Sequence, residues 1–124
     1  MNANVAEFLR ATARRTPDAV ALVCGDTSLT WAELDAAVDA RAAGLIRHGL
    51  HAGDRVAFLL GNGLAFVEAY YACARAGLVS VPLNPAFTVA EVAVLLSDSG
   101  ARMLIVQPET RHVGLDAADA LPGC

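Results

Sequence analysis

Lysine is absent from this chain of 124 residues, and all nine of its basic residues are arginine. A Walker-type phosphate loop requires a lysine after its glycines, so that loop is excluded. The G-x-S-x-G pattern of a strand-to-helix serine nucleophile is absent too. The arginines are scattered and the formal net charge is −4, whereas nucleic-acid binding needs a clustered positive face. We therefore expect no nucleic-acid partner.

Long apolar runs are also missing, although hydrophobic residues make up 56% of the chain. Runs such as 56–60 are far shorter than the roughly 20 residues that span a bilayer. The amino terminus has no charged leader followed by an apolar stretch, and Glu7 interrupts the place where one would lie. The length favours a single domain at most. We expect no transmembrane segment and a cytoplasmic location.

Cysteine is scarce, and its spacing excludes the usual frameworks. Cys24, Cys73 and Cys124 stand far apart, with no C-x-x-C pair and an odd count. Disulfide scaffolds and zinc sites need closely spaced or paired cysteines. We expect Cys24 and Cys73 to be small buried hydrophobic residues, and Cys124 to be an exposed terminal thiol.

Capping patterns and turns organise the first half of the chain. Asn4 to Glu7 has the form of a capping box, which predicts a helix ending near Arg15. Apolar stretches at 19–24 and 27–29 flank a Gly-Asp turn and predict a hairpin. A second capping box at 30–33 opens a long helix that stops at Gly49. At helical spacing, one face of the first helix carries Val5, Phe8, Leu9 and Thr12, and we expect that face to pack against a core. The second helix runs through Leu34, Val38, Leu45 and Ile46.

From Arg55 onward the predicted order is β-α-β-α-β. The strands cover 55–60, 79–81 and 102–106; one helix ends at Gly77 and the next begins at Thr88. Crossovers of this length imply parallel strands and right-handed connections. The runs 58–60 and 103–106 are typical of strands covered on both faces. The first of these helices carries Phe66, Val67, Tyr70, Cys73 and Ala74. In the second, Val92, Leu95 and Leu96 are expected to point inward, and a turn follows at 97–100.

The last residues show no clear periodicity. After Gln107-Pro108 we expect a poorly defined tail over about 107–124, in which a helix around 115–121 is an option without a supporting pattern.

The Gly61-Asn62-Gly63 sequence, between a strand and a helix, is the first candidate for binding a ligand. Phosphates favour helix amino termini with free N–H groups. The dinucleotide fingerprint, however, needs a small residue where Phe66 stands and an acidic residue in the loop 82–85, and neither is present. We interpret the two glycines as turn formers.

Histidine and carboxylate spacings offer weaker candidates. His48, His51 and Asp54 could approach one metal ion, but Gly49 breaks the helix between the histidines. His112 stands alone. We predict no metal site.

The pair Asp35 and Asp39, and the single residue Asn84, are candidate site residues that also have a simpler structural explanation. Asp35 and Asp39 are four residues apart on one helix and resemble an acid–base pair, but a solvated acidic face is the simpler interpretation. Asn84 lies between prolines at the end of a strand, where ligands bind in parallel sheets, and where asparagine also commonly forms turns. We assign no catalytic or cofactor-binding residue.

Six short motifs follow one another along the chain: Leu29–Leu34, Gly53–Ala57, Asn62 with Phe66, Arg75–Gly77, Val81–Pro85 and Ser99–Ala101. As an ordered set they resemble the N-terminal region of the adenylate-forming superfamily, which contains acyl-CoA synthetases, peptide-synthetase adenylation domains and luciferases. The resemblance covers about residues 4–106. Asn84 favours fatty acyl-CoA ligases over amino-acid adenylation domains, which more often carry Asp there, and Ala65 departs from the Glu of many relatives.

The resemblance implies an α/β fold in which residues 1–124 form a partial N-terminal subdomain of an AMP-binding domain. The parent reaction joins a carboxylate, preferably a medium or long fatty acid, to coenzyme A through an acyl-adenylate, with ATP and Mg²⁺. The family's Pro-Lys-Gly loop, Thr-Glu motif, ribose-binding Asp and C-terminal lysine have no matching positions here.

We therefore expect a truncated fragment that is inactive alone, binds no cofactor and has the rest of the ligase domain as its partner. We also expect exposed apolar surface where that partner docks. The alternative is a stand-alone α/β nucleotide-binding module using the strand ends near Gly61 and Asn84, or a non-catalytic interaction module.

Overall fold

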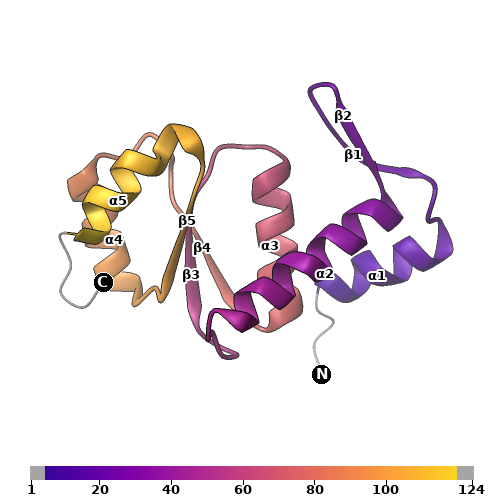
Figure 1. The fold of residues 1–124 in the computed structure, drawn as a ribbon, viewed down its shortest axis with the longest axis horizontal. Coiled ribbons are helices and arrows are strands. Elements are labelled where there is room, and N and C mark those ends of the chain that lie inside the picture. Colours follow the sequence, from indigo (N-terminus) through magenta and orange to yellow (C-terminus); the bar gives the residue numbers. More distant parts are fainter. Residues whose placement is uncertain (1–4, 120–124) are drawn as a thin grey trace.

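A three-stranded parallel sheet lies between two layers of helices in the computed structural model, which describes residues 5–119 (Figure 1). A separate two-stranded hairpin projects from one end of the molecule (Figure 1). The elements in chain order are α1 (Val5–Arg15), β1 (Val20–Cys24), β2 (Thr27–Thr30), α2 (Trp31–Arg47), β3 (Arg55–Leu59), α3 (Leu64–Ala76), β4 (Val79–Pro82), α4 (Val89–Ser99), β5 (Met103–Val106), a 3₁₀ turn (Pro108–Thr110) and α5 (Arg111–Asp119).

The central sheet has the strand order β4-β3-β5, with all neighbours parallel. Arg55 pairs with Val79 on one side of β3, and Val56 pairs with Met103 on the other. Helices α2 and α3 cover one face, while α4 and α5 cover the opposite face (Figure 1). Strand β3 is wholly buried from Val56 to Leu59 because both layers meet on it. The predicted β-α-β-α-β order and parallel pairing are confirmed.

Side chains close the helix ends as the sequence predicts. The Thr30 hydroxyl accepts a hydrogen bond from the Glu33 N–H at 3.2 Å, and the Glu33 carboxylate accepts one from the Thr30 N–H at 2.9 Å. Thr88 and Glu91 make the same reciprocal pair at 3.2 and 3.0 Å. Gly77 ends α3 with a φ of 76°, which costs a glycine little. Asn4, the cap predicted for the first helix, lies outside the described residues.

The buried face of α1 differs from the prediction. Its buried residues are Ala6, Leu9 and Ala13, whereas Phe8 is 63% exposed and Val5 is also exposed. Helix α1 packs on α2 and α3 rather than on the sheet. Alanine side chains let the helices approach closely, so the small residues face inward and the phenylalanine faces outward. Judged by hydrophobicity alone, Phe8 would be expected to be more buried than Ala6 and Ala13, which is the reverse of what the structure has.

Two apolar helix positions are exposed, and the predicted burial of Cys24 is wrong. Ile46 is 56% exposed on α2, and Tyr70 on α3 is exposed as well. Cys24, the last residue of β1, is exposed as well. Cys73, by contrast, is buried as predicted. Cys124 lies outside the described residues.

Residues 97–119 are more regular than the sequence indicates. The turn predicted at 97–100 is the last turn of α4, which ends at Gly100 with a φ of 67°. The region expected to be a poorly defined tail contains the 3₁₀ turn and α5, which begins at Arg111 rather than near residue 115. Its buried positions are Gly114 and Ala117, too small to produce an apolar period in the sequence. Residues 120–124 lie outside the described part.

None of the helices within residues 5–119 is long and apolar enough to cross a membrane. The longest, α2, has 17 residues and contains five charged side chains. Because a spanning helix needs about 20 apolar residues, α2 fails on both counts.

Candidate functional site

The carboxyl ends of the three parallel strands are the first place to look for a ligand site. The chain leaves β3 at Leu60-Gly61 toward α3 on one face, and leaves β5 at Gln107 toward α5 on the other face. In open parallel sheets, ligands bind where neighbouring strands diverge to opposite faces in this way. The crevice between the ends of β3 and β5 is therefore the switch point of this sheet.

The protein's own side chains fill that crevice. The Gln107 Oε1 accepts a hydrogen bond from the Gly61 N–H at 3.0 Å. The buried Thr110 hydroxyl donates to the Leu59 carbonyl at 2.6 Å and accepts from the Gln107 N–H at 3.1 Å. The Gly61 amide is thus already paired and is not available to a phosphate. The backbone bends at residues 62–63, and neither Gly61 nor Gly63 has the left-handed backbone that would require glycine.

Sequence reasoning missed Gln107 and Thr110. A signal was present, because a threonine three residues after Gln107, with proline between them, is typical of a cap closing a short turn. The partners Gly61 and Leu59, however, are about 50 positions earlier in the chain, and no local pattern identifies them.

Asn84, after β4, is an exposed turn residue. Its Oδ1 accepts a hydrogen bond from the Ala86 N–H at 2.9 Å, which is the side-chain turn that asparagine commonly forms. The Phe87 N–H donates to the Asn84 carbonyl at 3.0 Å, so both acceptors of the residue serve the loop. Within residues 5–119, no hydrogen bond joins Asn84 to Gly61.

The histidines are dispersed. The Asp54 carboxylate accepts from the backbone N–H of His51 at 2.8 Å and so closes a turn, while His48 ends α2. His112 is exposed on α5. Over residues 5–119, no group of three or more His, Cys, Asp or Glu side chains is arranged to hold a metal ion.

Asp35 and Asp39 are brought together with two arginines instead of forming the predicted solvated face. Arg75 Nη2 donates to Asp35 Oδ1 at 2.7 Å, and Arg75 Nη1 donates to Asp39 Oδ1 at 2.9 Å. Arg10 donates to Asp39 at 2.6 Å. Asp35 is half-buried, which corrects the prediction for that residue, whereas Asp39 is exposed. Carboxylates paired in this way stabilise the helices rather than exchange protons with a substrate.

This Asp–Arg cluster joins three helices, because Arg10 comes from α1, the aspartates from α2 and Arg75 from α3. The sequence placed Arg75 in the Arg75–Gly77 motif but did not identify it as the partner of Asp35 and Asp39.

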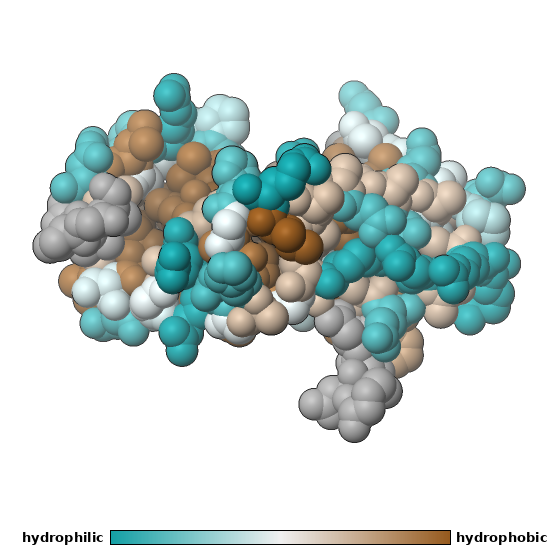
Figure 2. Space-filling model, turned by 60° about the horizontal axis from the view of Figure 1, so that its bottom comes forward, coloured by the Kyte–Doolittle hydropathy of each residue, from teal (hydrophilic) through white to brown (hydrophobic). Residues whose placement is uncertain are grey.

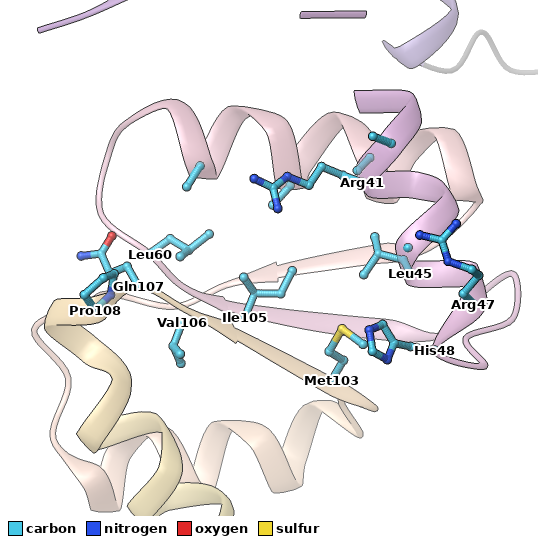
Figure 3. A pocket seen from close by; sticks show the side chains of 15 residues that line it. Arg41, Leu45, Arg47, His48, Leu60, Met103, Ile105, Val106, Gln107 and Pro108 are labelled. Atoms are coloured by element: carbon cyan, nitrogen blue, oxygen red, sulfur yellow. The ribbon is translucent and has the colours of Figure 1, made fainter. Parts of the chain in front are cut away.

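A cleft of about 590 Å³ lies between α2, α3 and β5 (Figure 3). Its floor is apolar, and Ile105 and Met103 lie along it in Figure 3, with Leu60 and Leu45 above them. Arg41, Arg47 and His48 stand at its rim, and Arg41 is paired with Glu68 at 3.1 Å. Within the described residues no buried side-chain nitrogen or oxygen lacks a partner. The cleft therefore offers apolar contact rather than a converging set of reactive groups.

Comparison with known proteins assigns the chain to a family. The family model described as AMP-binding enzyme matches residues 9–123. A feruloyl-CoA synthase from Amycolatopsis sp. is 47% identical over 97 residues, covering 78% of this chain and 20% of that protein. A medium-chain fatty-acid–CoA ligase from Escherichia coli is 36% identical over 118 residues, covering 92% and 21%. The chain thus spans about a fifth of the length of these curated relatives.

Solved structures give the same result. A fatty acyl CoA synthetase from Mycobacterium tuberculosis superposes with a TM-score of 0.89 at 34% identity, covering 96% of this chain and 24% of that one. The matched segments include the capped helices and the parallel strands described above. This chain therefore belongs to the family of AMP-binding enzymes, and the three relatives named above are CoA ligases or synthetases.

Proposed function

We propose that this chain is the N-terminal part of the AMP-binding domain of an ATP-dependent acyl-CoA ligase, and that it is not catalytic by itself. The whole domain activates a carboxylate as an acyl-adenylate and transfers the acyl group to coenzyme A. The family match over residues 9–123 is the observation that carries this proposal, together with relatives named as CoA ligases.

Among the described residues, the candidate groups at the strand switch point and on α2 are already paired with one another rather than free for ATP or Mg²⁺. Stabilising the phosphates of ATP needs cations or free backbone N–H groups. The sequence has no lysine, and the Gly61 N–H at the strand switch point is held by Gln107. The carboxylates of Asp35 and Asp39 are paired with arginines. We accordingly assign no catalytic step to a residue of this chain, and the reacting groups belong to the remainder of the domain.

The substrate we propose is a medium or long fatty acid, based on the Val81–Pro85 sequence with asparagine at 84. The relatives include ligases named for aromatic acids as well as for fatty acids, so a panel of acids is the proper assay. The partner we propose is the rest of the ligase domain, in the cytoplasm.

Two measurements test the proposal. The isolated chain is expected to give no ATP–pyrophosphate exchange with octanoate, palmitate or ferulate. A chimera, in which this chain replaces the matching N-terminal segment of the E. coli medium-chain ligase, is expected to form acyl-CoA, whereas that ligase without the segment is expected to form none. Exchange by the isolated chain would contradict the fragment proposal, and a folded but inactive chimera would contradict the proposed role in the ligase.

A further inference from the structure

An asparagine followed directly by a glycine occurs once in the chain, at Asn62-Gly63 in the loop between β3 and α3. In Figure 1 this loop leads from the carboxyl end of β3 to the first turn of α3. Asparagine is one of the thermolabile residues that hyperthermophilic proteins contain less of. Glycine has no Cβ, so its backbone nitrogen can approach the side-chain amide carbon of the preceding asparagine without obstruction. The loop therefore holds a reactive amide next to an accessible nucleophile.

The fold leaves both of these groups unheld. Asn62 is exposed, and among residues 5–119 no hydrogen bond involves its side chain. Within the same residues the Gly63 N–H donates to no acceptor. The neighbouring Gly61 N–H, by contrast, is held by Gln107 Oε1 at 3.0 Å. The contacts that fix the loop therefore end one residue before the Asn62-Gly63 pair.

Asn84, which follows β4, has the opposite properties. Its Oδ1 accepts a hydrogen bond from the Ala86 N–H at 2.9 Å. The next residue is Pro85, whose ring nitrogen carries no hydrogen and cannot act as a nucleophile. Both Asn62 and Asn84 are exposed and follow a strand, so Asn84 is a control within the same molecule.

The start of α3 accepts a negative charge at this position. Three other helices have a glutamate in their first turn, namely Glu7 in α1, Glu33 in α2 and Glu91 in α4. Helix α3 has no acidic residue there, and its N-cap Gly63 makes no side-chain hydrogen bond to the first N–H groups. A carboxylate at position 62 would stand beside the positive end of the helix, where negative charge is favourable. An aspartate at this position is therefore compatible with the fold.

We propose that Asn62-Gly63 is a self-modification site, at which Asn62 is converted into aspartate and isoaspartate without an enzyme. The Gly63 backbone nitrogen forms a bond to Asn62 Cγ, the bond from Cγ to Nδ2 breaks, and Nδ2 leaves as ammonia with the proton from Gly63. Water then opens the succinimide ring. Opening at Cγ gives aspartate, opening at the backbone carbonyl carbon gives isoaspartate, and neither step needs an oxidant or a reductant. This inference does not depend on the proposed function.

Peptide mapping of the chain after a long incubation tests the proposal. Trypsin cleaves after arginine, so Asn62 is the only asparagine in peptide 56–75 and Asn84 is the only one in peptide 76–102. In mildly alkaline buffer, Asn62 is expected to be converted to an acid at least about tenfold faster than Asn84. Isoaspartate is expected among the products, because direct hydrolysis of the side chain gives aspartate alone. Conversion without isoaspartate, or at equal rates in the two peptides, would overturn the proposal.

The effect of the fold is measured by comparing the folded chain with the same chain in denaturant. Circular dichroism verifies that the two samples are folded and unfolded. Because the structure holds neither reacting group and surface loops are mobile, the folded chain is expected to react within about tenfold of the unfolded rate. A larger slowing in the folded chain would mean that the fold protects Asn62 and would refute the inference.

Two glycine variants separate the nucleophile from the rest of the loop. The backbone accepts Gly63→Ala, because Gly63 has an extended φ of 163° and the added Cβ meets nothing closer than Cys24 Sγ at 3.7 Å. Gly61→Ala is the matched control, since its Cβ meets Gln107 at 3.5 Å and Asn62 keeps its glycine neighbour. Gly63→Ala is expected to slow the conversion at least about fivefold, and Gly61→Ala to leave it within about twofold. Equal rates in the two variants would contradict the assigned nucleophile.

Association of the chain has to be separated from the reaction. Figure 2 shows hydrophobic surface gathered on the half of the molecule that carries α4 and α5. Because the succinimide forms within one chain, its rate is expected to be the same at low and high protein concentration. A rate that rises in proportion to concentration would show that a second molecule takes part, against the proposal.

The variant Asn62→Asp reproduces one of the two products. It is expected to melt at or above the temperature of the unmodified chain, because the new carboxylate lies beside the positive end of α3. A lower melting temperature would show that the fold does not accept the product at this position.

Discussion

Arg75 and Asp35 form a half-buried ion pair in which one guanidinium reaches two different acceptors on the same aspartate. Nη2 donates to the Asp35 carboxylate at 2.7 Å, and Nη1 donates to the Asp35 backbone carbonyl at 3.1 Å. Nη2 also donates to the Ala6 carbonyl at 3.0 Å, so this side chain connects α3 to both α2 and α1. Only a planar group with several donors can do this, and an ammonium cannot reproduce the geometry.

The first prediction concerns this pair. Arg75→Lys is expected to lower the free energy of unfolding by about 2 kcal/mol, because hydrogen bonds to charged, half-buried groups are lost. Arg10→Lys is the control, since the Arg10 side chain is 40% exposed and such pairs contribute about 1 kcal/mol or less. Urea denaturation followed by circular dichroism measures both. Equal losses in the two variants would contradict the central role of Arg75.

Cys73 leads to a prediction about pH. Burial raises the pKa of the Cys73 thiol from 9.0 to about 11, against a smaller lowering by a side-chain hydrogen bond with Ser80. Since the unfolded thiol loses its proton near pH 9 and the folded one near pH 11, the unfolded state binds fewer protons between these values. Stability is therefore expected to be fully present below pH 9 and to fall as the pH rises to 11.

The Cys73→Ala variant is the control for this pH dependence. Its free energy of unfolding is expected to be lower at pH 7, because a buried side chain is shortened, but to fall less steeply between pH 9 and 11. At pH 8, iodoacetamide is expected to label the exposed Cys24 and to leave Cys73 unmodified until denaturant is added. Rapid labelling of Cys73 in the folded chain would contradict the prediction.

The capping box of α4 allows a test by titration. Hydrogen bonds from the backbone and then the side chain of Thr88 hold the pKa of Glu91 below its ordinary value of 4.5. The stabilisation is present above the unfolded pKa and is lost as the pH falls through the folded one. Thr88→Ala is expected to move the Glu91 pKa upward, as measured by NMR titration, because the cap that holds the carboxylate is disrupted.

The same substitution removes the Thr88 hydroxyl from the Glu91 N–H and is expected to lower the stability of the domain by about 1 kcal/mol. Thr88→Ser is the matched control and should retain both the low pKa and the stability. An unchanged Glu91 pKa in Thr88→Ala would show that the capping box does not govern this carboxylate.

Replacing either of two helical glycines, Gly114 or Gly44, by alanine is expected to change the stability of the domain in opposite directions. A Cβ on Gly114 would lie 2.5 Å from Val106 Cγ1 and 3.2 Å from Leu104 Cδ2, so α5 would have to move away from the sheet. Gly114→Ala is expected to destabilise the domain by about 1–2 kcal/mol, because overpacking exceeds the gain in helix propensity. A Cβ on Gly44 meets nothing closer than 4.0 Å, so Gly44→Ala is expected to stabilise it by about 0.5–1 kcal/mol. Thermal melting distinguishes the signs, and a stabilising Gly114→Ala would contradict the packing of α5.

Several features were accessible from the sequence because their causes are local. The reciprocal caps at Thr30 and Thr88 involve residues three positions apart, and Gly77 ends its helix by its own backbone freedom. The alternation of apolar strands with helices likewise repeats within short windows, and it predicted the parallel β3-β4-β5 unit. Family membership follows from the order of the same short motifs.

The interpretation of the site depended on distant partners. The sequence indicated that Gly61 forms a turn, but not that Gln107 closes the crevice beside it, because the two residues are 46 positions apart. In the same way, the sequence led us to expect a solvated Asp35. Its partner Arg75 lies 40 positions further along the chain, so no local pattern identifies the pair.

By itself, the sequence determined the caps, the order of helices and strands and the family, all of which depend on neighbouring residues or on their order. Only the tertiary structure decided which residues of α1 are buried and how the aspartates are paired. The physical reason is that burial depends on the surfaces that helices and strands present to one another. Small residues such as Ala6 and Gly114 permit close packing, and hydrophobicity along the chain does not reveal it.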